Sequence, residues 1–394
     1  VPDAIELCRE LGLEGEMTQP ATGRAKVYVN GALKFLPTDT VLGVPVEFGP
    51  LEDSGLLSAA GVLRARSEVD QDWSAPDRDV SIGAFLEERY GRELVDNVVA
   101  PLIGGINAGN VDKLSLASVT PQLASAAAEG GSLTLALRRR AAALSAQAPD
   151  APIFRALVQG TGRLVEALES ALIERGVTIR LNCSVSRIEA GSVTLNDGER
   201  LHCDALLICT PAPAAAELLA GINNAVANEL RAITYSSVAL VTMVYDRASL
   251  SDIDLDASGF LIPRSAQLLM TAASIGSTKW EHWNDGSHIV MRVSAGHSTD
   301  NRGETLSDEE LLSGLVEDLR QTIGIEAAPV ASRISRWRRG FAQYEVGHAE
   351  RVDRIQTELN SAAPNIALAG ASYRGLGIPA CISQGRSAAR ALLS

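Results

Sequence analysis

The residues best suited to chemistry lie near the C-terminal end, where three glycines separate an apolar run from a helix-forming run. Asn365 to Ala369 has the length and character of a buried strand, and Ser383 to Leu393 can form a helix. Between them, Gly370, Gly375 and Gly377 let backbone approach a ligand closely. Free N–H groups at the helix N-terminus suit a phosphate or an electron-rich ring edge. The pattern predicts half of a dinucleotide site or, alternatively, a plain strand, loop and helix that close a domain.

The other half of such a site is not visible in the sequence. A two-part dinucleotide fold carries a GxGxxG turn near its start, and the residues that follow Val1 contain none. The chain also opens without an initiator methionine or a signal-like segment. We therefore expect the sequence to begin after the first strand and the phosphate-binding turn of such a fold.

Composition limits the possible classes of protein. The chain has 394 residues, of which 46% are hydrophobic and 21% charged, as is ordinary for a globular enzyme with more than one core. A net charge of −13 argues against nucleic-acid binding and against anionic membranes. No apolar run reaches the roughly 18 residues of a membrane span. Five cysteines without a CxxC pair suggest reduced thiols, so we expect a cytoplasmic protein without disulfides or zinc.

Standard catalytic arrangements are also missing from the sequence. The five histidines show no HExxH or other ligand spacing, so no metal site is predicted. There is no P-loop and no GxSxG nucleophile motif. We therefore predict no catalytic side chain, because an enzyme of this kind usually takes its chemistry from an organic cofactor.

Hydrophobic periodicity predicts a chain of mixed α/β and α+β character. The Asn30-Gly31 pair predicts a hairpin, and Ser81 is expected to cap a helix that breaks at Gly91. Pro101 to Gly109 is interpreted as a glycine-rich loop, and Leu114 to Arg140 as further helix.

The second half of the chain alternates helices with strands. A helix is expected to end at Gly176, with strand Val177 to Leu181 directly after it. Asp197-Gly198 predicts a hairpin turn between strands Val185 to Leu195 and Arg200 to Cys209. Further strands are predicted at Val238–Tyr245, Gly259–Ile262 and His288–Ser294, and a helix at Ser307–Ile323.

Several motifs together resemble one family, the flavin-dependent protoporphyrinogen and coproporphyrinogen III oxidases within the amine-oxidase-like flavoproteins. The resemblance covers nearly the whole chain. Its motifs are Tyr28-Val29-Asn30-Gly31 with Leu36-Pro37, Pro101 to Gly109 with Leu114-Ser115-Leu116, Gln343 to His348, and Ala369 to Pro379.

The resemblance implies a noncovalent FAD and a porphyrinogen substrate in haem biosynthesis. In this family a hydride passes from a carbon bridge of the macrocycle to flavin N5, and oxygen reoxidises the flavin. Enzymes of later haem-pathway steps are the implied partners. Such a reaction depends on positioning in a dry pocket and demands no dedicated side-chain base.

The resemblance also implies three domains. Residues 14–150 would form a mostly helical domain, and residues 216–345 an α+β domain that faces the substrate. Residues 151–215 and 346–394 would form a Rossmann-like FAD-binding domain that lacks its first strand and glycine motif. We accordingly expect the isolated chain to bind FAD weakly or not at all.

Site residues follow from the same resemblance, position by position. The residues implied to contact FAD are Val185, Trp337, Gly370, Ala371, Leu376, Gly377 and Ile378. Without the resemblance, Val185 would be an ordinary strand residue, and Trp337 could be a surface tryptophan covered by neighbouring arginines. For the substrate, Gly105 backbone would lie near the pyrrole nitrogens, and Leu261 would pack on the macrocycle. Arg24 would bind a propionate, with Lys26 as a second cation, unless Arg24 is simply solvated.

Other functions remain open from the residues alone. A carotenoid desaturase or an amine oxidase would also use a flavin in this way. A tetrapyrrole-binding module without redox activity is the non-enzymatic alternative.

Overall fold

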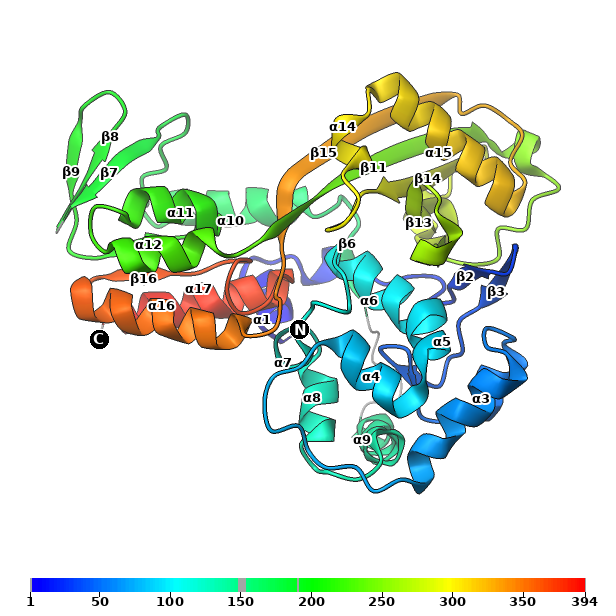
Figure 1. Ribbon diagram of the computed structural model, residues 1–394. Coiled ribbons are helices and arrows are strands. Elements are labelled where there is room, and N and C mark those ends of the chain that lie inside the picture. The colour runs from blue at the N-terminus through cyan, green and yellow to red at the C-terminus, as the bar shows by residue number, and fades with distance from the viewer. Residues whose placement is uncertain (1, 148–153, 190, 394) are drawn as a thin grey trace. The chain divides into compact units, whose positions relative to one another are not determined.

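The computed structural model describes residues 2–147, 154–189 and 191–393, which fold as two units (Figure 1). Unit 1 combines residues 1–18, 155–234 and 347–394. Unit 2 combines residues 19–154 and 235–346. The expected domain boundary near residue 150 lies outside the described residues, and the division into three domains stays a prediction.

Unit 1 is an α/β unit built around two short parallel strands. β10 (Leu206–Ile208) pairs with β16 (Ile366–Leu368), and Leu206 lies opposite Ile366. A separate antiparallel sheet contains β7 (Val185–Glu189), β8 (Ser192–Leu195) and β9 (Arg200–His202). The predicted strand near residues 365–369 and the hairpin turn at Asp197-Gly198 are both confirmed; Gly198 has the positive φ of 91° that this turn requires.

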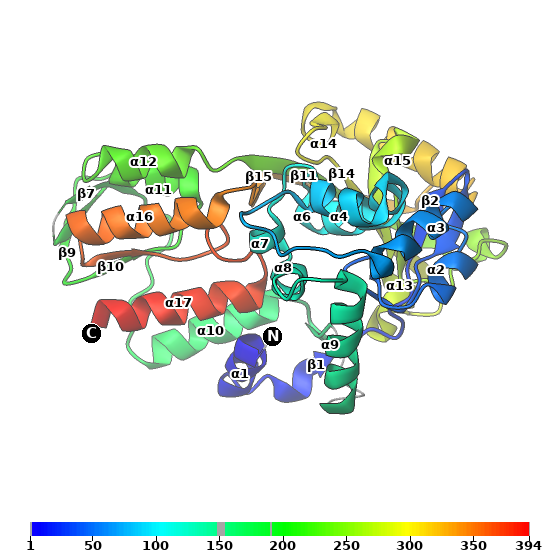
Figure 2. The ribbon, with the colours of Figure 1, turned by 60° about the horizontal axis from the view of Figure 1, so that its bottom comes forward.

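Helices of unit 1 flank these strands. They are α1 (Pro2–Glu10), α10 (Gly162–Glu174), α11 (Ala212–Leu219), α12 (Asn224–Arg231), α16 (His348–Ala362) and α17 (Ile378–Leu393). Figure 2 shows α11, α12 and α16 side by side. At α1, Glu6 and Glu10 form ion pairs with Arg386 of α17, at 2.9 and 2.7 Å. A further short pair, β1 (Met17–Thr18) with β6 (Ala156–Leu157), joins two distant parts of the chain.

The predicted strand Val185 to Leu195 is divided into β7 and β8, which pair with each other because Gly191, with a φ of 74°, turns the chain between them. The predicted strand Arg200 to Cys209 is divided into β9 and β10, because β10 leaves that sheet to pair with β16.

Two further predictions in unit 1 were wrong. Val177 to Leu181 is not a strand, because a strand needs a neighbour to complete its hydrogen-bond ladder; among the described strands of this unit, β10 and β16 pair only with each other. Leu181 consequently stays 74% exposed. The last helix begins at Ile378, five residues before the predicted Ser383, because Pro379 is well tolerated in a first helical turn.

Unit 2 is organised by a seven-stranded mixed sheet. Its strands run in the order β15 (Ala331–Ala342), β11 (Tyr235–Asp246), β14 (His288–Ala295), β13 (Met270–Ile275), β12 (Gly259–Leu261), β2 (Lys26–Val29) and β3 (Ala32–Phe35). Neighbours are antiparallel except β12 and β2. The predicted hairpin is confirmed: Asn30 and Gly31 join β2 to β3 with φ angles of 55° and 78°. Strands β11, β12 and β14 and the helix after Ser307 also lie where the sequence predicts them.

One long helix covers this sheet. α15 (Asp308–Ile323) begins with a capping box, in which Ser307 and Glu310 satisfy each other's backbone N–H groups. Leu311, Leu315 and Leu319 on its apolar face are fully buried with sheet residues such as Met243. Each such leucine contributes about 1.5–3 kcal/mol by burial. The sheet and α15 therefore share one hydrophobic core.

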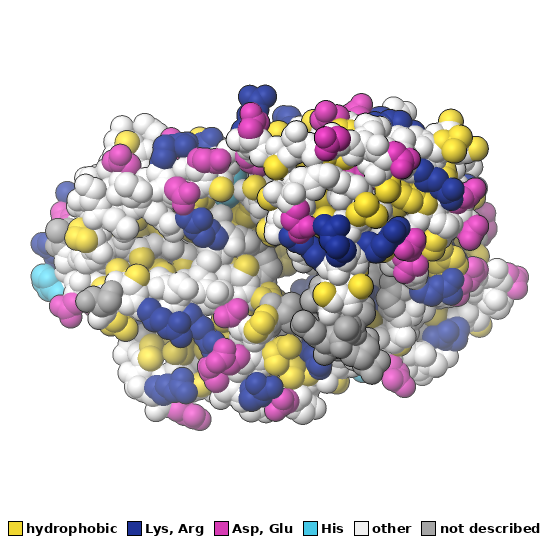
Figure 3. Space-filling view, turned by 90° about the horizontal axis from the view of Figure 1, so that it is seen from below, with side chains coloured by type: hydrophobic (Ala, Val, Ile, Leu, Met, Phe, Trp, Pro, Cys, Tyr) yellow, Lys and Arg dark blue, Asp and Glu magenta, His cyan; other side chains and the backbone are white. Residues whose placement is uncertain are grey.

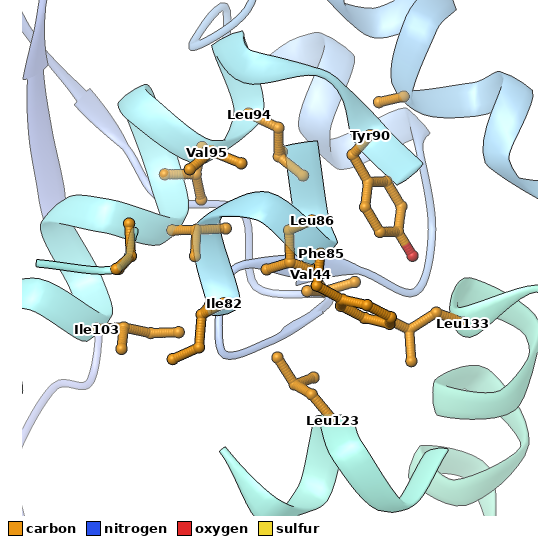
Figure 4. Packing of buried hydrophobic residues seen from close by; sticks show 14 of the residues in the cluster. Val44, Ile82, Phe85, Leu86, Tyr90, Leu94, Val95, Ile103, Leu123 and Leu133 are labelled. Atoms are coloured by element: carbon orange, nitrogen blue, oxygen red, sulfur yellow. The ribbon is translucent and has the colours of Figure 1, made fainter. Parts of the chain in front are cut away.

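A second core in unit 2 lies among helices. Its members include α4 (Ile82–Tyr90), α5 (Arg92–Leu94), the π-helical turn Val95–Val99 and α6 (Ala100–Asn107); the others are α2 (Gly49–Asp53), α3 (Ala59–Arg66), α7 (Leu116–Val119), α8 (Pro121–Ala127) and α9 (Leu133–Gln147). Figure 4 shows Val44, Phe85 and Leu86 packed together in this core. The predicted cap and break are confirmed, since the Ser81 hydroxyl accepts the Ala84 N–H and Gly91 separates α4 from α5.

Two further predictions in this region were wrong. The glycine-rich stretch from Pro101 to Gly109 is not a loop, because its first seven residues lie in α6, where Pro101 occupies the first turn. The helix forms despite two interior glycines because Ile103, which lies between Pro101 and these glycines, is buried in the helical core. Gly104 is tightly packed, since a Cβ there would lie 3.0 Å from the Gly109 carbonyl oxygen, whereas Gly105 is exposed. The single helix expected from Leu114 to Arg140 is divided among α7, α8 and α9.

An exposed histidine of β14 provides a test of local electrostatics. His288 Nδ1 lies 2.7 Å from the Asp285 carboxylate. This carboxylate raises the pKa of His288 above 6.5, and the same interaction lowers the pKa of Asp285 to about 2. We expect an NMR titration of His288 with a midpoint above 6.5, and we expect Asp285→Asn to return it toward 6.5. An unchanged midpoint in that variant would contradict the ion pair.

The sign of the linked stability follows from both shifts. The raised pKa of His288 stabilises the fold below pH 6.5 and loses its effect as pH rises through the folded-state value. The lowered pKa of Asp285 stabilises above pH 3.8 and loses its effect as pH falls toward 2. Their pairing should therefore favour folding most between about pH 4 and 6.5.

Charge is distributed over the surface of both units. Figure 3 shows acidic and basic side chains interspersed over the face that it presents. Among the described residues, no helix is long and apolar enough to cross a membrane.

Candidate functional site

The predicted ligand-binding turn of unit 1 lies between β16 and α17. Gly370 and Gly375 have φ angles of 126° and 125°, which side-chain-bearing residues rarely adopt. A Cβ on Gly375 would lie 2.6 Å from Ala380 Cβ in the first turn of α17. Gly377 and Ile378, at the start of α17, are exposed. The turn thus offers open backbone beside the N-terminus of a 16-residue helix.

Hydrogen bonds to two other elements, α11 and α16, hold this turn in place. The Ser372 hydroxyl accepts the Ala212 N–H at the start of α11, at 3.0 Å. His348 Nε2 lies 2.9 Å from the Tyr373 carbonyl oxygen, so α16 contacts the same segment. Arg374 Nη2 donates to Asp353 at 2.6 Å.

One further side chain ties the turn to α17. Gln384 receives the Arg374 N–H on its Oε1 at 3.2 Å and donates from Nε2 to the Gly375 carbonyl oxygen at 3.5 Å. The turn is therefore anchored on both sides of its glycines, as a preformed ligand site requires.

The fit between this turn and a flavin dinucleotide can be judged from its conformation. The five predicted turn residues Gly370, Ala371, Leu376, Gly377 and Ile378 are brought together within one segment. Its open glycine backbone and helix N-terminus match a phosphate-bearing cofactor. Val185, by contrast, is the first residue of β7 in the separate three-stranded sheet, where it is 37% exposed. Backbone groups rather than charged side chains would make the contacts at this turn.

Two cysteines of unit 1 lie near the turn. Burial raises the pKa of both the Cys209 and the Cys381 thiols. A thiol with a raised pKa is a poor nucleophile at neutral pH. The cysteines of this region therefore offer no reactive thiolate.

Two of the predicted substrate residues of unit 2, Gly105 and Leu261, lie side by side. Gly105 lies on α6, and a Cβ added there would lie 3.6 Å from Leu261 Cδ2 at the end of β12. The structure thus places side by side two residues that are 156 positions apart in sequence. Ile106 beside Gly105 is 60% exposed, and Leu261 is half-buried. We call Gly105, Ile106 and Leu261 the apolar wall.

Buried polar contacts hold the end of α6 that carries this wall. Gln343, which is 4% exposed, donates from Nε2 to the Asn107 carbonyl oxygen at 3.0 Å and to the Ser236 hydroxyl at 2.9 Å. Its Oε1 would lie 2.6 Å from a Cβ on Gly109, so only glycine fits there without displacement. Sequence reasoning missed this role of Gln343, because no local pattern links it to residues more than 230 positions away.

The two predicted carboxylate-binding cations differ in availability. Lys26 is 8% exposed, and its Nζ lies 2.8 Å from Asp254 and 2.6 Å from Asp256. Two carboxylates already neutralise it, so Lys26 is poorly suited to receive a third. Arg24 is exposed and places its guanidinium carbon 3.7 Å from the centre of the Phe35 ring.

Trp337 lies on β15 in unit 2, whereas the other predicted flavin residues belong to unit 1. Its side chain is 59% exposed. Arg336 turns away from it to form an ion pair with Asp308, and the Arg339 guanidinium lies 6.0 Å from the Tyr235 ring. No cation–π contact of the described residues involves Trp337. The aromatic face therefore stays accessible.

These features together define a class of protein. One segment suits a dinucleotide, an apolar wall suits a hydrophobic substrate, and within the described residues no group of His, Cys, Asp and Glu side chains could hold a metal. Residues 2–393 match the model of the family described as flavin containing amine oxidoreductase. The chain belongs to this family, so it is an oxidoreductase with a flavin cofactor.

Individual relatives narrow this class. The chain is 32% identical to the coproporphyrinogen III oxidase of Bacillus subtilis, an alignment that covers 98% of this chain and 82% of that protein. It is 28% identical to human protoporphyrinogen oxidase, over 98% of this chain and 83% of the human protein. The crystal structure of an Exiguobacterium protein provisionally named a protoporphyrinogen oxidase is similar, with a TM-score of 0.86, 28% identity, and coverage of 99% of this chain and 85% of that one.

Proposed function

We propose that this chain is an FAD-dependent porphyrinogen oxidase of haem biosynthesis, with coproporphyrinogen III as preferred substrate and protoporphyrinogen IX as the alternative. The observation that carries this proposal is the near-full-length similarity to the Bacillus subtilis coproporphyrinogen III oxidase. The higher identity to that relative than to the human protoporphyrinogen oxidase favours the coproporphyrinogen substrate.

The proposed cofactor site is the glycine-rich turn of unit 1. Backbone at Gly370, Ala371 and Leu376 to Ile378 would contact the pyrophosphate, ribityl chain and ring of FAD, with α17 directing its N-terminus toward negative charge. Val185 would hold the adenine end, and Trp337 would flank the ring. When bound, FAD supplies a hydride acceptor that passes electrons on to oxygen.

The proposed substrate site is the apolar wall of unit 2. Gly105 leaves room for a macrocycle to approach the α6 backbone, and Leu261 offers an apolar surface for ring packing. Arg24 would receive a propionate through its guanidinium fork. None of the three wall residues carries a titratable group, which agrees with a reaction that depends on positioning rather than on a side-chain base.

The setting of the reaction is part of the same proposal. Five cysteines without a CxxC pair and the net charge of −13 support a cytoplasmic enzyme. Oxygen would be the final electron acceptor, and enzymes that use the oxidised porphyrin would be the partners.

Oxygen consumption tests the proposed function. Purified protein, supplied with excess FAD, should consume oxygen and produce fluorescent porphyrin from coproporphyrinogen III, and more slowly from protoporphyrinogen IX. Oxidation of an amine or a polyene in place of porphyrinogens would identify another activity of the same family. Quenching of coproporphyrin fluorescence without any oxygen uptake would instead identify a binding module.

A further inference from the structure

Arg264, which contacts the end of α6, forms no ion pair with the carboxylates that the structure describes. Arg264 follows β12 by three residues, and its Nη2 donates to the Gly109 carbonyl oxygen. Among the described residues, no carboxylate lies within 4.0 Å of its guanidinium nitrogens, although such pairs are numerous elsewhere on the protein. The guanidinium has five N–H donors, so most of them remain for another acceptor.

This arginine lies beside the apolar wall. Leu261, which contacts Gly105, precedes Arg264 by three residues. Arg264 also donates to the Gly109 carbonyl oxygen, and this oxygen lies 3.0 Å from the Cβ position of Gly104 in α6. The cation is therefore held at the end of α6 that carries the wall, and we call this position the rim of the wall. Its side chain is accessible from solvent.

Other cations near this rim are already neutralised. Arg92 binds Asp96 at 2.7 Å and Asp112 at 2.9 Å. Arg302 binds Asp300 at 2.6 Å. Burial, together with Arg264, lowers the pKa of His297 to about 4, so this ring is uncharged near neutral pH. Arg264 therefore differs from Arg92 and Arg302 in having no carboxylate within ion-pair distance among the described residues.

The electrostatic environment of Arg264 favours a further negative charge beside it. Partial burial of the guanidinium lowers the pKa of Arg264, and the nearby Asp112 opposes this effect only in part. A partly desolvated cation gains from a carboxylate that approaches its free N–H groups.

We propose that Arg264 binds a carboxylate of the substrate through its free guanidinium N–H groups and so helps to select a porphyrinogen rich in propionates. This inference rests on the proposed function. With Arg24, Arg264 gives the proposed substrate site two cations, which suits a macrocycle that carries several carboxylates on its rim.

Equilibrium binding of coproporphyrin III and of its tetramethyl ester tests this assignment. The ester has the same ring but no carboxylate. Arg264→Gln should weaken binding of the acid about 10- to 100-fold, measured by fluorescence quenching, and leave binding of the ester unchanged. The affinity of Arg264→Lys for the acid should lie between those of wild type and Arg264→Gln, because lysine keeps the positive charge but lacks the forked guanidinium.

Arg302→Gln is the matched control, because Arg302, like Arg264, is a positive charge that lowers the pKa of His297 and so lies in the same neighbourhood. It should leave binding of the acid within about twofold, since Arg302 is already paired with Asp300. Unchanged binding of the acid by Arg264→Gln would overturn the inference, as would an equal loss for the ester or for Arg302→Gln. If wild-type protein bound neither ligand, the proposed function itself would be wrong.

Discussion

Replacing Glu68 with glutamine is expected to destabilise unit 2 by about 3–5 kcal/mol, the cost of leaving a buried charge without its partner. Glu68 is fully buried, and its carboxylate lies 3.2 Å from Arg89 Nη1, which is itself almost fully buried. The guanidinium is further enclosed by the rings of Trp73 and Phe85, each 4.6 Å away. Glutamine has nearly the same shape but cannot neutralise this cation.

The same carboxylate also caps α9. It accepts the Leu133 N–H at 2.6 Å and the Ser132 hydroxyl at 2.7 Å. A glutamine side chain has only one oxygen, so part of this capping would also be lost. The effect of Glu68→Gln therefore combines charge and hydrogen bonding at one site.

Urea unfolding followed by tryptophan fluorescence measures this effect, because Trp73 lies within the cluster. Glu129→Gln is the matched control: its carboxylate pairs with Arg139 and Arg140 at the surface, so little change is expected. Removing both charges with Glu68→Gln and Arg89→Met together should recover part of the loss. Equal unfolding free energies for Glu68→Gln and Glu129→Gln would contradict the prediction.

Gly375→Ala is expected to weaken FAD binding at least tenfold, about 1.4 kcal/mol or more. At a φ of 125° an alanine is strained, and its Cβ would lie 2.6 Å from Ala380 Cβ. The turn must then move away from the N-terminus of α17, and the backbone that would approach the cofactor moves with it. Titration of FAD fluorescence with each protein measures the dissociation constant.

A second glycine of α17 provides the control for this substitution. Gly385 lies within the helix, and nothing lies within 4 Å of an added Cβ. Gly385→Ala should leave the FAD affinity unchanged and raise stability by up to about 1 kcal/mol, because alanine favours helix. A folded Gly375→Ala protein, judged by its circular dichroism, that bound FAD like wild type would argue against the turn as the cofactor site.

Elements with strong local signals were predictable from the sequence. The Asn30-Gly31 hairpin and the helix capped by Ser307 were predicted because turn chemistry and capping depend on residues that are neighbours in the chain. The helix of Pro101 to Asn107 was missed because interior glycines usually indicate a loop. Here burial of Ile103 in the helical core of unit 2 overrides that preference.

The residues of the candidate site were likewise predictable only in part. A resemblance of sequence motifs implied Gly105, Leu261 and the turn after Ala369. The sequence also offered Lys26 as a carboxylate-binding cation, but in the structure two aspartates neutralise it. Arg264 was not recognised at all. Its significance depends on the absence, among the described residues, of a carboxylate within 4.0 Å of its guanidinium nitrogens, a property that no stretch of sequence displays.

The sequence alone determined the Asn30-Gly31 and Asp197-Gly198 hairpins and the helix capped by Ser81, and through its motifs it indicated a flavin and a tetrapyrrole. These properties follow from residues within a few positions of one another, whose conformational preferences act locally. Only the tertiary structure decided which distant residues meet: Gly105 with Leu261, Gln343 with Asn107, and Arg264 with Gly109. The availability of a cation depends on charges brought near it by folding, so it is a property of the packed protein rather than of the chain.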